Sequence, residues 1–164
     1  MNIMCKVVIV VSLIAIVELI IIIVMHRSFN RILSSLKKLS QKHLEIAMTL
    51  NKFLIMKQQG WKLTDWFQSK HISSIAIYGM GYIGERLYTE LKSEKMDVRY
   101  AIDKNASAIY TELKIKTMGD RLDEVDAVVV TAVYYYEEIA NALKHRMVCP
   151  ILSIDDILDD ILNR

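Results

Sequence analysis

Clustered metal-binding or disulfide-forming residues are missing from this sequence, which has two cysteines and four histidines in 164 residues. Cys5 and Cys149 lie near opposite ends of the chain, so they suggest no disulfide framework and no zinc-type pair. The histidines are scattered, and we therefore expect no metal site. Cys149 precedes Pro150 at the start of an apolar run, a position typical of a buried thiol.

Net charge is also small. The 21 Lys and Arg residues exceed the 19 Asp and Glu residues by only two, which gives a formal charge of +2. We expect no nucleic-acid partner from so small an excess. Apolar residues, in contrast, make up 53% of the chain, and much of this excess lies in the first 25 residues.

Residues 7–25 form a run of Val, Ile and Leu that is broken only by Ser12, Ala15 and Glu18 before it ends at Met25. As a helix it would be roughly 28 Å long, close to the ~30 Å hydrocarbon core of a bilayer. Glu18 costs about 2–3 kcal/mol on insertion scales, less than the gain from the many branched apolar side chains. We expect residues 1–26 to be a transmembrane anchor, with Glu18 a functional carboxylate, a contact with a partner helix, or a tolerated protonated acid.

A cleaved signal peptide is the alternative to an anchor. Its apolar region is usually about 7–15 residues long and ends at a small-residue cleavage site, which residues 25–29 do not offer. Only Lys6 precedes the apolar run, whereas five basic residues follow it within residues 27–42. The positive-inside rule then predicts a single-pass protein of the cell membrane whose C-terminal domain is cytoplasmic.

Residues 27–59 are expected to form a helical stalk, because proline and glycine are absent until Gly60. Apolar residues recur there at alternating steps of three and four, as in a coiled coil. We expect a homodimer through this seam; packing within the same chain or on the membrane surface is the alternative. The seam consists of Phe29, Ile32, Leu36, Leu39, His43, Ile46, Leu50 and Phe53.

Residues 60–164 open with a Rossmann-like pattern of strand, glycine turn, helix and second strand. The turn Gly79-Met80-Gly81-Tyr82-Ile83-Gly84 follows an apolar strand at 74–78, and a helix is expected over 85–95. Such glycines permit a tight turn, close approach of a phosphate and helix–strand packing. The helix start, near Tyr82 and Ile83, would face the anion.

Asp103 ends the second strand, expected at 98–102, where a carboxylate can accept hydrogen bonds from ribose hydroxyls. It would repel a 2′-phosphate, which favours NAD(H) over NADP(H). Lys104 could contact an adenylate or be solvated. Thr131 and the row Tyr134–Tyr136 fall where the loop after the fourth strand would meet the ligand, or they serve packing.

Further strands are expected at 113–117, 127–131 and 150–154, and helices at 137–145 and 156–162. An α/β fold follows, with helical crossovers and a five-stranded parallel sheet in the order 3-2-1-4-5. We expect no catalytic residue. Two Tyr-x-x-x-Lys spacings, at Tyr88/Lys92 and Tyr110/Lys114, precede the place where dehydrogenases carry that pair, and the 80 or so residues after the glycine turn leave no room for a substrate domain.

The stretches 75–84 (IAIYGMGYIG) and 101–106 (AIDKNA) resemble a family of small bacterial Rossmann modules. These are the N-terminal nucleotide-binding domains of membrane-bound nucleoside-diphosphate-sugar epimerases and dehydratases, and related domains of surface-polysaccharide biosynthesis. The resemblance covers roughly residues 60–160. It implies that Gly79, Gly81, Gly84 and Asp103 contact NAD(H) or a nucleotide sugar.

Two functions are compatible with these features. One is a binding or regulatory module that docks onto a polysaccharide-biosynthesis enzyme or transporter, similar to the NAD-sensing domains of potassium transport systems. The other is the nucleotide-binding subunit of a split oxidoreductase or sugar epimerase or dehydratase, whose catalytic part is another chain.

Overall fold

A computed structural model describes residues 3–109 and 111–163, and the side chains of residues 5–8, 10 and 15 are left aside. Tyr110, of the second Tyr-x-x-x-Lys spacing, lies outside the described residues. The chain divides into two compact units, Met1–His43 and Leu44–Arg164. The second unit therefore begins before residue 60, where the sequence analysis placed the start of the globular domain.

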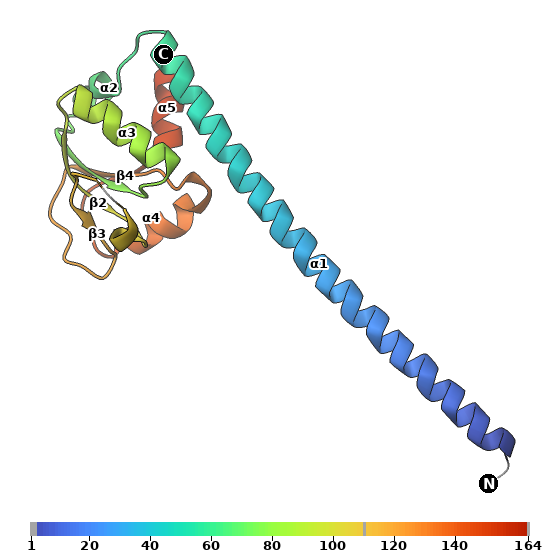
Figure 1. The fold of residues 1–164 in the computed structure, drawn as a ribbon. Helices are drawn as coiled ribbons and strands as arrows, with labels where there is room; N and C mark the ends of the chain where they lie inside the picture. Colours follow the sequence, from blue (N-terminus) through green and yellow to red (C-terminus); the bar gives the residue numbers. More distant parts are fainter. Residues whose placement is uncertain (1–2, 110, 164) are drawn as a thin grey trace. The chain divides into compact units, whose positions relative to one another are not determined.

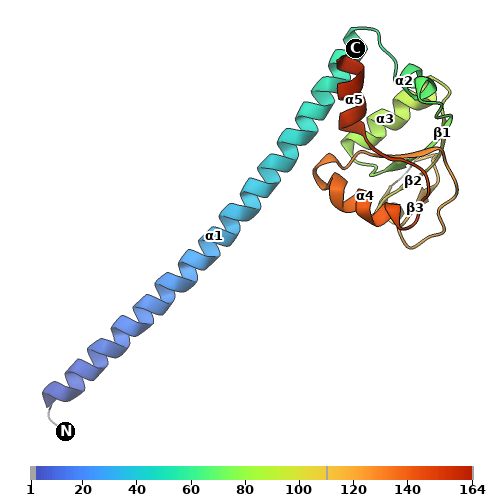
Figure 2. The same ribbon diagram turned by 180° about the vertical axis from the view of Figure 1, so that it is seen from behind.

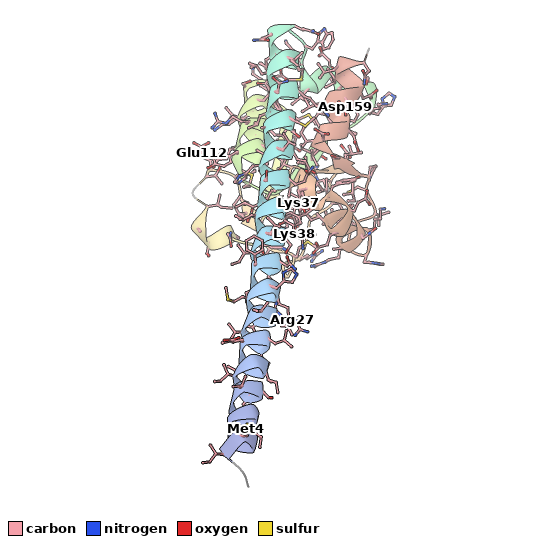
Figure 3. The ribbon with its side chains drawn as sticks, turned by 90° about the vertical axis from the view of Figure 1, so that its right-hand side faces the viewer. Met4, Arg27, Lys37, Lys38, Glu112 and Asp159 are labelled. Atoms are coloured by element: carbon pink, nitrogen blue, oxygen red, sulfur yellow. The ribbon has the colours of Figure 1, made fainter. Side chains whose placement is uncertain are left out.

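The first unit belongs to a single helix, α1 (Ile3–Gln58), which continues into the second unit. The expected anchor and stalk are thus parts of one helix rather than separate elements, as the absence of proline and glycine permits. One segment of α1 is long and apolar enough to cross a membrane, judged by length and composition. Its described apolar side chains are exposed, from Ile9 to Val24. Arg27, Lys37 and Lys38 follow along the same helix (Figure 3).

The two halves of the apolar seam differ in their exposure to solvent. Phe29, Ile32, Leu36 and Leu39 are exposed, by 50% or more of their surface. Phe53 and Met56 are instead buried in the core of the second unit, and Ile46 and Leu50 pack against it. The C-terminal half of the expected dimer seam is therefore used within its own chain.

The sheet has five parallel strands in the order β3-β2-β1-β4-β5, which confirms the predicted topology. The central strands β1 and β4 are buried on both faces, as a parallel sheet covered on both sides requires. The edge strand β3 is shorter than expected, two residues in place of 113–117. The strands are β1 (Ser74–Tyr78), β2 (Asp97–Ile102), β3 (Ile115–Lys116), β4 (Ala127–Val130) and β5 (Ile151–Ser153).

Helices cover the two faces of the sheet unequally (Figure 1). One face packs against the end of α1, α2 (Leu63–Ser69), α3 (Tyr82–Ser93) and α5 (Ile154–Leu162). The other packs against α4 (Tyr136–Lys144) and the loop before β4, through Leu122 and Val125. Short 3-10 turns, η1 (Ala106–Ala108) and η2 (Val133–Tyr135), complete the elements.

The predicted helical crossovers are present from β1 to β2 and from β4 to β5, as α3 and α4, whereas the described residues on either side of β3 form no α-helix. Between β2 and β3 the described residues form the single turn η1, and residues 117–126 reach β4 without a helix. Polar contacts hold this loop in place of helical packing. Tyr100 donates its hydroxyl hydrogen to the Asp123 carbonyl at 2.6 Å, and the Lys116 ammonium contacts the Asp123 carboxylate at 2.5 Å.

The last turns of α1 lie beside α5 (Figures 1 and 2), and polar contacts hold the two together. Thr49 donates to Asp155 at 2.7 Å, and Lys52 lies 2.8 Å from both Asp155 and Asp159. Burial by itself lowers the pKa of Lys52, but the hydrogen bonds and charges of the two aspartates raise it overall. The Lys52 ammonium is therefore a stable cation between two carboxylates.

Candidate functional site

The turn between β1 and α3 depends on two of its three glycines for its shape. Gly79 has φ +95°, a conformation that L side chains rarely adopt. A Cβ at Gly84 would lie 2.0 Å from the carbonyl oxygen of Gly79, far inside any normal contact distance. The fold therefore requires glycine at both positions, whether or not a ligand binds.

Gly81 is different, because nothing in the described structure requires it to be glycine. Its φ of −79° suits any residue, and no heavy atom beyond its chain neighbours lies within 4 Å of the place where a Cβ would stand. It is the N-cap of α3 and provides no side-chain cap. The first N–H groups of a helix lack intrahelical partners and form the positive end of its dipole. A bare backbone at that end is suited to an anion such as a phosphate.

The other turn residues divide between core and solvent. Met80 and Ile83 bury their side chains in the core, so only their main chains are available at the turn. The side chain of Tyr82 is instead 77% exposed. Lys104, expected near an adenylate, also has an exposed side chain.

Asp103 is brought to the glycine turn, as the spacing predicted. One carboxylate oxygen accepts a hydrogen bond from the Met80 N–H and the other from the Asn105 N–H, both at 2.8 Å. Each oxygen has two acceptor positions, so one on each is left for a further donor such as a ribose hydroxyl. Asp103 thus stabilises the turn and has further acceptor positions beside it.

Thr131, expected to contact the ligand, lies against the backbone of the turn. Its side chain is only 5% exposed, and its hydroxyl oxygen lies 2.5 Å from the Gly79 carbonyl oxygen and 3.1 Å from that of Tyr78. The hydroxyl therefore donates a hydrogen bond to a backbone carbonyl oxygen of the turn and links the end of β4 to the end of β1. Thr131 thus positions the turn, and its contact with a ligand stays a prediction.

Comparisons with protein-family models, with curated proteins and with solved structures find no match for this chain. The assignment of a site therefore depends on the geometry of the chain's own residues.

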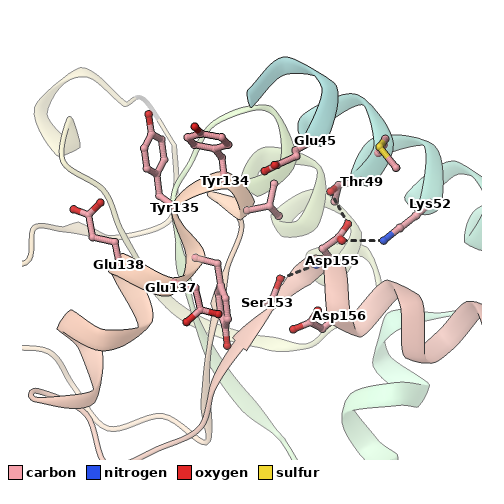
Figure 4. Close-up of a pocket in the computed structure, with 13 residues that line it drawn as sticks. Glu45, Thr49, Lys52, Tyr134, Tyr135, Glu137, Glu138, Ser153, Asp155 and Asp156 are labelled. Carbon is pink, nitrogen blue, oxygen red and sulfur yellow. Dashed lines mark hydrogen bonds and ion pairs between the residues drawn. The ribbon is translucent and has the colours of Figure 1, made fainter. Parts of the chain in front are cut away.

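A cavity of about 540 Å³ lies at the same edge of the sheet, beyond the carboxyl ends of β4 and β5 (Figure 4). Ligand pockets usually have volumes of about 300–1,000 Å³. Its walls come from α1, from η2 and the start of α4, and from the start of α5. The lining includes Glu45, Thr49, Lys52, Tyr134, Tyr135, Glu137, Glu138, Ser153, Asp155 and Asp156.

Several acidic side chains lie at the carboxyl edge of the sheet. Burial, together with the charges of Asp103 and Glu138, raises the pKa of the Tyr78 phenol at the end of β1. Carboxylates also occupy the first turns of α4 and α5, where helix dipoles stabilise them. No three His, Cys, Asp or Glu side chains within the described ranges are arranged to hold a metal ion.

Sequence reasoning noted the tyrosines but missed the cavity beside them. Pairs of acidic residues at the starts of two expected helices were a local signal for part of its lining. The wall from α1 had no local signal, because Glu45 and Lys52 reach the cavity only after the helix packs on α5.

Neither the Tyr88/Lys92 pair nor Cys149 is among the described residues that line the cavity. The Tyr88/Lys92 pair lies on α3, where the Lys92 ammonium pairs with the exposed Glu112 carboxylate. Burial raises the pKa of the Cys149 thiol, which keeps it protonated and a poor nucleophile at neutral pH.

Proposed function

We propose that this protein is a membrane-anchored nucleotide-binding module that holds NAD(H) or a nucleotide sugar and performs no chemistry by itself. The bare Gly81 at the uncapped start of α3 carries the proposal. The resemblance noted in the sequence supports a role in bacterial surface-polysaccharide assembly, beside an enzyme or a transporter.

The alternative is a glycine turn that serves packing alone. Packing accounts for Gly79 and Gly84, since a side chain at either would strain the backbone or strike it. It does not account for Gly81, where a Cβ would meet open space. A glycine with no structural requirement, at a helix N-terminus and next to an acid that can accept ribose hydroxyls, is what phosphate recognition needs.

Gly81→Ala should therefore weaken binding at least tenfold while leaving the fold nearly intact. The added methyl group would occupy the space through which a phosphate approaches the α3 N–H groups, and we expect a loss of tenfold or more, about 1.4 kcal/mol. Loss of a glycine N-cap should cost less than about 1 kcal/mol of stability. Calorimetry on the full chain in detergent, with NAD+ and with UDP-glucose, measures the first effect, and thermal unfolding the second.

Two results would contradict the proposal. One is a wild-type chain that binds neither probe at millimolar concentration. The other is a Gly81→Ala variant that binds as tightly as the wild type, which would return the turn to a purely structural role.

Membrane anchoring is supported by exposed apolar side chains between Val11 and Val24. Their hydrophobic surface is compatible with lipid and costly in water. The basic residues that follow favour a cytoplasmic location for the nucleotide module. The ligand would then be drawn from the cytoplasmic pool.

A homodimer is the proposed oligomer, through the part of the helical seam that remains exposed. The seam residues Ile46, Leu50 and Phe53 pack within the chain, which leaves the exposed positions Phe29, Ile32, Leu36 and Leu39. On a heptad pattern, Lys37 and Lys38 fall on the opposite face of the helix.

Cysteine crosslinking distinguishes a dimer through the apolar seam from contact through the opposite face of the helix. With Cys5 and Cys149 replaced by alanine, Leu36→Cys should give a disulfide-linked dimer in native membranes, and Lys38→Cys should give much less. Non-reducing electrophoresis measures both. Equal crosslinking at the two positions would indicate random collision and would remove the dimer.

A further inference from the structure

Glu18 is the only charged residue of the apolar run at 7–25. Its side chain is exposed, and among the described residues none donates a hydrogen bond to its carboxylate or forms an ion pair with it. The described side chains one helical turn away, Ile14, Ile21 and Ile22, are apolar. A carboxyl group without a polar partner is costly in hydrocarbon, so a partner for Glu18 has to come from another molecule.

The apolar seam of the stalk continues into this run and includes Glu18. From Phe29 to Leu39 the exposed seam positions follow one another at alternating steps of three and four. Continued toward the N-terminus, the same steps reach Met25, Ile22 and Glu18. Met25 and Ile22 are 65% and 61% exposed, so this part of the seam is uncovered as well.

The phase of the seam is kept because α1 is one unbroken helix from Ile3 to Gln58 (Figure 3). Glu18 precedes Phe29 by roughly three turns, so the two side chains lie about 20° apart around the helix axis. Ile20 is instead about 160° away from Glu18, on the opposite face. Glu18 therefore projects from the face that carries the exposed stalk seam.

A second copy of the chain is the partner that this placement favours. Copies of a single-pass protein cross the bilayer in the same direction, so their helices pack parallel to each other. In a parallel dimer with two-fold symmetry, identical seam positions face one another. Pairing through Phe29 and Leu39 thus brings the two Glu18 carboxyl groups together inside the membrane.

The chemistry of the carboxyl group is compatible with this pairing. A protonated carboxyl has one O–H donor and retains acceptor positions, so two of them can donate to each other reciprocally. Two ionised carboxylates would instead repel strongly in a medium of low dielectric constant. The paired arrangement therefore satisfies both side chains in their neutral form, which a lone helix in lipid does not.

We infer that Glu18 is the intramembrane contact of the homodimer, in which the protonated carboxyl groups of two copies hydrogen-bond to each other across the seam. This inference rests on the proposed membrane anchoring and on the proposed dimer. It makes the apolar segment a dimerisation element as well as an anchor. It also assigns one role to Glu18 among those that the sequence left open.

Sedimentation equilibrium of the full chain in density-matched detergent tests the inference. Glu18→Leu removes the hydrogen bonds and should raise the dimer dissociation constant by about threefold to tenfold, the usual strength of polar contacts between membrane helices. Glu18→Gln has an amide that both donates and accepts, and we expect its dissociation constant to stay within about twofold of the wild type.

A relocated acid is the matched control. Glu18→Leu combined with Ile20→Glu keeps one carboxyl group in the apolar run but moves it to the opposite face of the helix. It should dimerise as weakly as Glu18→Leu alone. Cysteine crosslinking in native membranes gives a second measurement, with Cys5 and Cys149 replaced by alanine. Ile22→Cys, on the seam, should form a disulfide-linked dimer, and Ile20→Cys should form much less.

The outcomes separate this inference from the proposed dimer. The inference is overturned, while a dimer through the stalk stands, if Glu18→Leu dimerises as tightly as the wild type or more tightly. The same holds if Glu18→Gln is as weak as Glu18→Leu, if the relocated acid restores dimerisation, or if Ile20→Cys crosslinks as well as Ile22→Cys. A wild-type chain that is monomeric at all concentrations would overturn the inference and the dimer together, and would leave nucleotide binding unaffected.

Discussion

Gly84→Ala should destabilise the second unit by about 3 kcal/mol, the upper end of the usual cost of overpacking. The added Cβ would lie 2.0 Å from the Gly79 carbonyl oxygen and 3.2 Å from the Thr131 hydroxyl oxygen. The first atom is backbone and cannot rotate away, so α3 must shift from β1. That shift would separate Ile83 and Leu87 from a core in which both are fully or almost fully buried.

Thermal unfolding followed by near-ultraviolet circular dichroism measures this effect, expected as a fall in Tm of roughly 10 °C. Gly81→Ala is the control, since it makes the same chemical change three residues earlier in open space. A similar Tm for the two variants would mean that the backbone of the turn shifts at little cost, and that packing does not require glycine at position 84.

Most of the sheet could be predicted because its signals are local. The apolar strand before Gly79 and the buried series Ile83, Leu87 and Leu91 specify a strand, a turn and a helix within one short stretch. The run at 127–130 predicted a strand that is buried on both faces. Parallel connectivity then followed from the alternation of elements.

The edge of the sheet was harder to predict because its stability comes from single side chains. An alternating pattern over 113–117 suggested a full strand, yet only Ile115 and Lys116 pair with β2. The Lys116 ammonium instead anchors the following loop at Arg121 and Asp123. No periodicity in the sequence identifies such a loop, because a few polar contacts of single side chains hold it in place.

The candidate site divides in the same way. The glycines and Asp103 form a motif in the sequence and lie together in the structure. Thr131 lies beside the turn, but its hydroxyl contacts backbone there, and the sequence could not indicate this because a hydroxyl can point to ligand or to backbone. The cavity combines segments that are far apart in the chain, so no single stretch could predict it.

A protein that begins at Leu44 should fold and stay in solution, whereas one that begins at residue 60 should not reach a stable fold. The shorter protein lacks Phe53, which is 8% exposed, and Met56, which is fully buried. Removing a buried Phe or Met side chain costs about 3–5 and 2–5 kcal/mol, and their sum approaches the whole stability of an ordinary domain. It also lacks Thr49 and Lys52, leaving Asp155 without both partners.

Single substitutions in the full chain distinguish core packing from mere chain length. Phe53→Ala should lower stability by about 3–5 kcal/mol, and the neighbouring Leu54→Ala by less than about 0.5 kcal/mol, because Leu54 is 54% exposed. Chemical denaturation followed by tryptophan fluorescence measures both, since Trp66 lies in the same core. Equal effects would show that the end of α1 is detached from the domain. A large difference would show that the end of α1 is part of the core that stabilises the second unit.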